Sequence, residues 1–107
     1  MAQDVYYRYV DDVEAALIRQ NRRIEPAPNQ TLKWYTLDRY DTAQEAQQFL
    51  ALPYLPTYRV GPIPSDEFPG LDQVQVRPVG ANHKQPGGGV EGATSKVHYL
   101  FSITPIP

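Results

Sequence analysis

The chain has 107 residues, the length of one ordinary domain, so we treat residues 1–107 as a single domain. It has no cysteine, which excludes disulfides, thiolate metal sites and cysteine nucleophiles. Ten basic and 12 acidic residues give a formal net charge of -2, which disfavours binding of nucleic acid or of a membrane by the whole surface. No apolar run approaches the roughly 20 residues that span a bilayer, and the first residues do not form a signal peptide. We therefore expect a soluble protein.

The first segment of regular structure is predicted at Val5–Val10 (VYYRYV), because its β-branched and aromatic residues favour a strand. Asp11 follows directly, and Glu14 lies three residues after it, which is the spacing of a helix capping box. This pattern predicts a helix that runs to about Gln20. Its apolar residues fall along one side, which carries Val13, Ala16, Leu17 and Gln20.

The same order of strand and capped helix is expected a second time. Asn21–Gln30 contains two prolines and is predicted as a loop, with a short extended piece around Ile24. Thr31–Leu37 (TLKWYTL) has the composition of a strand. Thr42 and Glu45 form a second capping box, which opens a helix that ends before Pro53.

Downstream of the second helix the pattern is that of short strands between breakers. Gly61–Gly70 carries three prolines and is predicted as a rigid surface loop, whereas Gly80–Gly89 (GANHKQPGGG) is predicted as a mobile one. The fold class we expect is α+β, with two short helices in the N-terminal half packed on a mostly antiparallel, twisted or split sheet. The strands expected in this half are Thr57–Val60, Leu71–Val79, Val90–Thr94 and Val97–Ile103.

Glu91 is the strongest candidate for a catalytic residue. It follows three adjacent glycines, which are tolerated where a backbone passes close to something, and it begins a predicted strand. A loop and strand of this kind would hold one carboxylate at a fixed position. The alternative is a disordered hairpin loop followed by a solvated glutamate.

Arg8 is the one charged residue inside the first predicted strand, so its guanidinium must be paired or must face a cleft. Its planar fork suits a phosphate or a ribose. The alternative is an arginine on an edge strand that pairs with Asp11, Asp12 or a neighbouring glutamate.

The sequence Trp34-Tyr35-Thr36 on the second strand offers flat rings and a hydroxyl, which are groups that hold an aromatic base or a nicotinamide. Core packing is the alternative for these three residues. We expect no metal site, because His83 and His98 lack the spacing of metal ligands and no HExxH pattern occurs. The glycines do not form a Walker or dinucleotide-binding loop, and no nucleophile elbow is present.

Taken together, an arginine in an aromatic first strand (YYRYV), a strand with an aromatic-threonine pair before a helix (KWYTLDRYDTAQEAQ) and a glycine loop before a glutamate (GGGVE) are similar to the small ADP-ribosyltransferase-like domains of bacterial effectors and toxins. The resemblance implies an ADP-ribosyltransferase or NAD glycohydrolase that uses NAD as its substrate. It implies that Arg8, Trp34, Tyr35 and Thr36 bind NAD and that Glu91 is catalytic.

The resemblance is compatible with a protein acceptor or a cognate inhibitor protein as a partner, and with a domain that is cytoplasmic or delivered as an effector. The acceptor of the ADP-ribose is a protein side chain, a nucleic acid or water, and the sequence does not select among them. The alternative function is a non-catalytic protein interaction module, because a tyrosine-rich sheet and proline-rich loops are features of interaction surfaces. The two hypotheses differ in one structural requirement. NAD chemistry needs Arg8, Thr36 and Glu91 to lie around one cleft, whereas an interaction module does not.

Overall fold

The computed structural model describes residues 5–26, 32–64, 74–95, 97–99 and 101–107. Within these residues the chain forms two helices and two three-stranded antiparallel sheets, as the sequence predicted for an α+β fold. The helices are α1 (Asp12–Asn21) and α2 (Ala43–Leu50). One sheet has the order β1 (Val5–Val10), β3 (Tyr58–Pro64) and β6 (Ile103–Pro105). The other has the order β2 (Lys33–Tyr35), β5 (Val90–Thr94) and β4 (Val74–Pro78).

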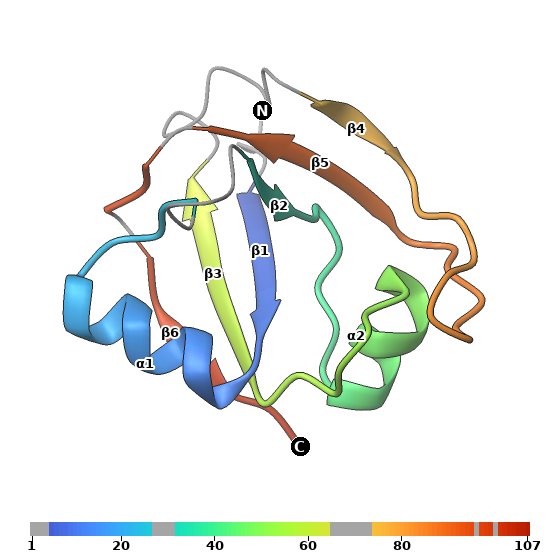
Figure 1. Ribbon diagram of the computed structural model, residues 1–107, viewed down its shortest axis with the longest axis horizontal. Coiled ribbons are helices and arrows are strands. Elements are labelled where there is room, and N and C mark those ends of the chain that lie inside the picture. The colour runs from blue at the N-terminus through green and yellow to red at the C-terminus, as the bar shows by residue number, and fades with distance from the viewer. Residues whose placement is uncertain (1–4, 27–31, 65–73, 96, 100) are drawn as a thin grey trace.

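The two sheets meet where β1 passes the end of β2. Tyr7 and Thr36 form an isolated antiparallel bridge, in which each N–H donates to the carbonyl of the other residue, at 2.8 and 2.9 Å. Figure 1 shows the consequence: β1, β3 and β6 form one layer, and β2, β5 and β4 arch across its end. The split sheet expected from the sequence is therefore confirmed, and β1 and β2 are brought side by side.

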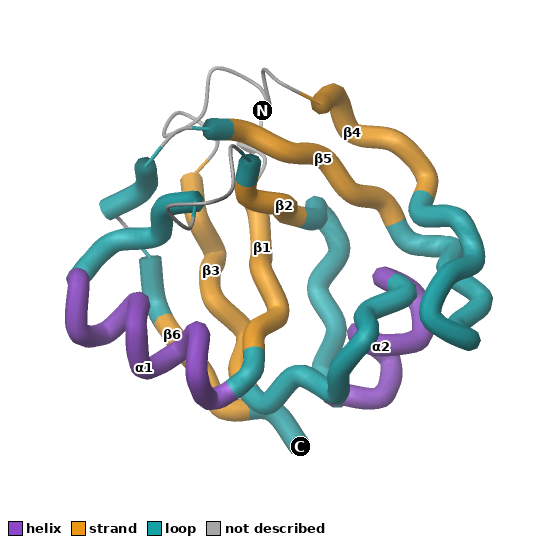
Figure 2. The backbone as a smooth tube through the Cα atoms, in the orientation of Figure 1, coloured by secondary structure: helices purple, strands orange, loops and turns teal. Residues whose placement is uncertain are grey.

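Both helices begin at the capping residues that the sequence predicted. The Asp11 side chain accepts the Glu14 N–H, and the Thr42 side chain accepts the Glu45 N–H. The helices lie at opposite ends of the view in Figure 2, with α1 against the first sheet and α2 beside the loop that joins β4 to β5. The inner side of α1 carries Ala15 and Ile18, so the side with Val13 and Leu17 faces solvent.

The expected rigid loop at Gly61–Gly70 is corrected at its start, because residues 61–64 belong to β3. Pairing with β1 explains this, since Ile63 lies opposite Tyr6 and is fully buried. Pro62 is exposed and falls at a register shift, where a strand tolerates a residue without an N–H. The remainder of that predicted loop, and the start of the strand predicted at Leu71, lie outside the described residues.

The strand expected at Val97–Ile103 is also corrected. His98 forms only a single bridge, with Ile24, and the last strand begins at Ile103. The bridge residues exchange both backbone hydrogen bonds at 2.9 Å, so the short extended piece predicted around Ile24 is present. Tyr35 and His98 add a polar contact to the core at this point, because the tyrosine hydroxyl and the imidazole Nδ1 are 3.1 Å apart.

The glycines before β5 are packed closely against α2. The last four carbonyls of a helix have no partner inside the helix. In α2 the Gln48 carbonyl accepts the Gly87 N–H and the Phe49 carbonyl accepts the Gly89 N–H, both at 3.0 Å. Gly87 and Gly89 are buried. Gly87 and Gly89, at the end of the predicted loop Gly80–Gly89, are therefore positions of close backbone contact with α2, whereas most residues at positions 80–86 are exposed.

Gly87→Ala should destabilise the fold by about 2 kcal/mol or more, because Gly87 has a φ of +75° and an added Cβ would lie 2.5 Å from the Val79 carbonyl oxygen. Thermal unfolding of the variant measures this loss. The matched control is Gly80→Ala, since a Cβ at Gly80 meets nothing within 4 Å. Equal melting temperatures for the two variants would show that the close packing of Gly87 is not needed.

Candidate functional site

A groove lies between the two sheets and the C-terminal end of α2. Its inner part is a cavity of about 50 Å³, and its outer part has a volume of about 450 Å³. Six residues line both parts, which makes them one continuous feature: Arg8, Trp34, Leu50, Leu52, Tyr54 and Glu91. The inner part has room for little more than one or two water molecules, whereas the outer part lies within the roughly 300–1,000 Å³ of ordinary ligand pockets.

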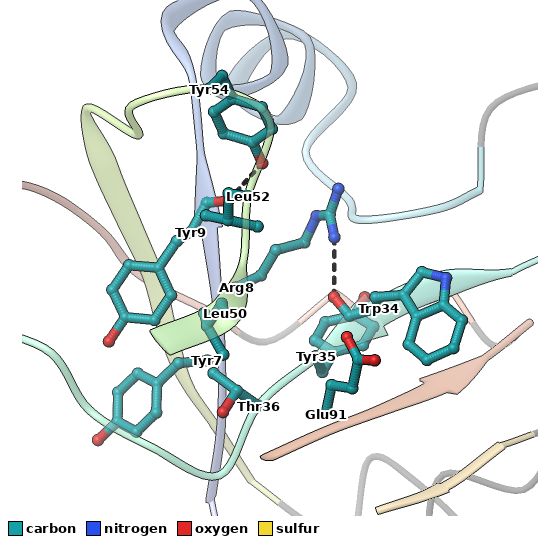
Figure 3. A pocket seen from close by; sticks show the side chains of 10 residues that line it. All are labelled: Tyr7, Arg8, Tyr9, Trp34, Tyr35, Thr36, Leu50, Leu52, Tyr54 and Glu91. Atoms are coloured by element: carbon teal, nitrogen blue, oxygen red, sulfur yellow. Dashed lines mark hydrogen bonds between the residues drawn. The ribbon is translucent and has the colours of Figure 1, made fainter. Parts of the chain in front are cut away.

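Each of the five residues singled out in the sequence lines the inner cavity, although they come from three different strands. Figure 3 shows Glu91 rising from β5 toward the side chains of Arg8 and Trp34. Arg8, Thr36 and Glu91 therefore lie around one cavity. The five residues are Arg8, Trp34, Tyr35, Thr36 and Glu91.

Glu91 is held in place through the residue before it. The Asp38 carboxylate accepts the backbone N–H of Val90 and the hydroxyl of Tyr40, each at 3.0 Å. A Cβ at Gly89 would lie 2.5 Å from the Tyr40 hydroxyl and 3.0 Å from the Asp38 carboxylate, so a larger residue would have to displace these side chains. Asp38 holds the N–H of Val90, and the Phe49 carbonyl holds the N–H of Gly89, so the start of β5 is fixed. Glu91 is therefore a carboxylate on a rigid strand.

The environment of Glu91 is partly apolar and contains one cation across the sheet. Burial raises the pKa of the Glu91 carboxyl, and the charge of Arg77 acts against that rise. Arg77 is the register partner of Glu91 on β4, so both side chains point to the same side of the sheet. The Arg77 guanidinium carbon also lies 5.3 Å from the centre of the Trp34 ring, which is a cation–π distance.

Arg8 is paired, as the alternative interpretation of the sequence required. Its Nε donates to Glu14 Oε2, its Nη2 donates to Glu14 Oε1 at 2.7 Å, and its Nη1 donates to the Trp34 carbonyl at 2.8 Å. These bonds use three of the five N–H donors of the guanidinium. Burial lowers the pKa of Arg8, but the hydrogen bond and charge of Glu14 outweigh it, so the guanidinium stays charged. Arg8 is therefore a fixed cation in the wall of the groove.

The aromatic-threonine sequence divides between the groove and the core. Trp34 is 36% exposed and forms part of both the inner and the outer walls. Tyr35 belongs to the hydrophobic core, and Thr36 is buried with its Oγ1 accepting the Asp38 N–H at 3.0 Å. Core packing is therefore correct for Tyr35 and Thr36, which form the back of the cavity. Trp34 is the member of the three that offers a ring surface to a ligand.

Sequence reasoning missed the residues that follow α2. Leu50, Leu52 and Tyr54 close the groove from the side opposite Glu91, and the Tyr54 hydroxyl donates to the Tyr9 carbonyl at 2.8 Å. A signal was present, because these apolar residues surround Pro53 immediately after a helix, where a polar turn is usual. The sequence does not show where these side chains point, so it did not predict that they would form a groove.

Two further properties concern the described parts of the chain. Within them no three histidine, cysteine, aspartate or glutamate side chains are grouped closely enough to hold a metal ion. The helices there are also too short and too polar to cross a bilayer. His83 lines the outer groove and His98 lies in the core, so the two histidines are far apart in environment.

Comparisons with family models, with curated proteins and with solved structures found no match for the chain. The assignment of a function therefore depends on the geometry of the groove.

Proposed function

We propose that the groove binds NAD and that Glu91 promotes cleavage of the bond between nicotinamide and ribose. The activity is that of an ADP-ribosyltransferase or an NAD glycohydrolase. The observation that carries the proposal is that Arg8, Thr36 and Glu91 line one cavity although they lie on separate segments of the chain. The sequence resemblance required this arrangement, whereas an interaction module did not.

The chemistry follows from the charge that develops on the ribose. As the C1′–N bond breaks, its electron pair leaves with nicotinamide and the ribose becomes an oxocarbenium-like cation. The ionised Glu91 carboxylate stabilises that cation and accepts a hydrogen bond from the 2′-hydroxyl. An oxygen or nitrogen nucleophile then attacks C1′ and loses its proton. Water as the nucleophile yields ADP-ribose, and a side chain of an acceptor protein yields a modified protein.

Trp34 and Arg8 serve binding in this proposal. The exposed part of the Trp34 ring is a flat surface on which the nicotinamide stacks. Arg8, which Glu14 and the Trp34 carbonyl hold in one orientation, supplies a preorganised positive charge for the pyrophosphate. Because Glu14 already occupies the Nε side of the guanidinium, Arg8 contacts a phosphate through its remaining terminal N–H donors.

Binding can be tested without turnover, because Trp34 is the single tryptophan of the chain. NAD should change the tryptophan fluorescence of the purified protein, and calorimetry should give the same dissociation constant. Nicotinamide release, followed with and without candidate acceptors, then measures cleavage. Absence of both binding and release would overturn the proposal. Binding without release would retain the roles of Trp34 and Arg8 and remove that of Glu91.

The pH dependence of NAD cleavage should show the raised pKa of Glu91. The ionised carboxylate is the active form, so the rate should fall as the pH is lowered through a pKa above the ordinary glutamate value of about 4.3. Arg8 and His83 share the groove with Glu91, and Arg77 faces it from β4. Of these, Arg77 is the cation whose charge lowers the pKa of Glu91.

Arg77→Met should therefore move the acidic fall of the rate to higher pH, because it removes the charge that lowers the pKa of Glu91. A pH profile of nicotinamide release measures the shift. Arg39→Met is the matched control, since Arg39 is exposed and its ion-pair partner is Asp41. A profile that Arg77→Met leaves unchanged would contradict the electrostatic role of Arg77.

The interaction-module hypothesis has one observation in its favour. The outward side of α1 carries Val13 and Leu17, which are 69% and 51% exposed, and large apolar side chains of this kind contribute to protein interfaces. The hypothesis does not require the groove. A chain that fails to bind NAD would leave this surface as the stronger indication of function.

A further inference from the structure

A second cavity, of about 320 Å³, lies between α1, the segment that follows it and the first residue of β2. Its volume falls in the range of ligand pockets. Part of its wall is apolar and is formed by Leu17, Ile18 and Pro26. The charged part includes Glu14 and Lys33, whose side chains form an ion pair with Lys33 Nζ 3.4 Å from Glu14 Oε2.

The four charged residues of this wall balance one another, but Arg8 of the groove adds a third cation, because it also pairs with Glu14. The side chains of Arg8, Glu14 and Lys33 are 16%, 21% and 11% exposed, so two cations share one carboxylate in a place largely sheltered from water. Arg23 and Glu25 at the edge of the cavity neutralise each other, because Arg23 Nε and Glu25 Oε1 are 2.9 Å apart. Charges that are sheltered from water are normally compensated. Among the side chains that the structure describes around this cluster, one positive charge is left over.

The state of Lys33 agrees with this excess of positive charge. Burial lowers the pKa of the Lys33 amine, and the charge of Arg8 lowers it further. Glu14 and Glu25 act in the opposite direction without restoring the pKa to its ordinary value. An added anion beside Lys33 would supply the missing compensation.

We propose that the second cavity binds a small carboxylate with an apolar body, the carboxylate lying against Lys33 and the apolar body against Leu17, Ile18 and Pro26. The anion is a carboxylate with a hydrocarbon chain and not a bare inorganic ion, because three of the four uncharged residues in the wall are apolar, the fourth being Asn21. The site is lined by none of the residues of the groove and does not depend on the proposed NAD chemistry.

Hexanoate is a suitable probe, and 1-hexanol is its neutral control of the same chain length. In protein labelled on the methyl groups, hexanoate should shift the Leu17 and Ile18 signals with a dissociation constant in the millimolar range, as expected for a ligand of its size. Hexanol should bind at least about fivefold more weakly, because it lacks the charged group that Lys33 recognises. Equal binding of the two, or no shift with hexanoate, would overturn the proposal.

Variants at Lys33 test the same point from the side of the protein. Lys33→Met should weaken hexanoate binding about tenfold, whereas Lys33→Arg should keep most of it. Lys33→Met leaves Glu14 paired with Arg8 as a neutral pair, so its melting temperature should not fall. Lys84→Met is the matched control, because Lys84 is exposed in the turn at residues 82–85. Unchanged hexanoate binding in Lys33→Met would show that the cavity has no carboxylate site.

Discussion

Glu91→Gln should lower the rate of nicotinamide release from NAD about 100-fold or more, while NAD binding stays within a few-fold of the unmodified protein. Glutamine has the shape of glutamate but lacks the charge that stabilises the oxocarbenium-like ribose. The fold should not suffer, because burial penalises the charged form of Glu91 and glutamine removes that penalty. Single-turnover assays measure the rate, and Trp34 fluorescence measures the binding.

Glu45→Gln is the matched control for this variant. Glu45 is exposed in the first turn of α2, and glutamine also satisfies a capping box there, so activity and melting temperature should stay unchanged. Glu91→Gln with undiminished nicotinamide release would remove Glu91 from catalysis. A loss of rate with an equal loss of NAD binding would mean that Glu91 binds the substrate without favouring the transition state.

Glu14→Gln should destabilise the fold by about 3 kcal/mol, because it leaves Arg8 and Lys33 as neighbouring cations without a carboxylate between them. Denaturant unfolding measures this loss. Glu25→Gln is the matched control, since Glu25 and Arg23 form an exposed pair whose loss should have little effect on stability. Similar losses in the two variants would contradict the special position of Glu14.

The same ion pair predicts how stability depends on acid. Burial acts to raise the pKa of Glu14, but the hydrogen bond and charge of Arg8, with Lys33, lower it below the ordinary value. A carboxyl whose pKa is lower in the folded state contributes stability above its unfolded pKa and loses it as the pH falls through the folded one. Glu14→Gln should therefore weaken the fall of stability at acidic pH, which denaturant unfolding at several pH values measures.

Local sequence signals predicted the elements that local interactions define. Asp11 and Thr42 predicted the starts of both helices because a capping side chain acts within three residues. The bounds of β1 followed from an unbroken run of strand-forming residues. The extension of β3 into Gly61 was not predictable, because a proline-rich segment becomes a strand only through its pairing with β1.

The sequence singled out some of the residues that line the groove, but not the wall after α2 and not the contacts within the site. Arg8 and Glu91 stood out as charged residues in or next to predicted strands, and both line the groove. The pairing of Arg8 with Glu14 was not predictable, although the two residues are only six positions apart. It depends on how the chain turns from β1 into α1, and the sequence does not specify this turn. The packing of Gly87 likewise depends on where α2 ends in space.

The position of NAD in crystals of the Glu91→Gln variant tests the central claim most directly, because this variant should bind NAD and cleave it only slowly. The account predicts NAD in the groove, with the nicotinamide against the Trp34 ring, the pyrophosphate beside Arg8 and the nicotinamide ribose within hydrogen-bond distance of the glutamine side chain at position 91. NAD bound elsewhere on the protein, or a groove that stays without NAD at saturating concentration, would contradict it.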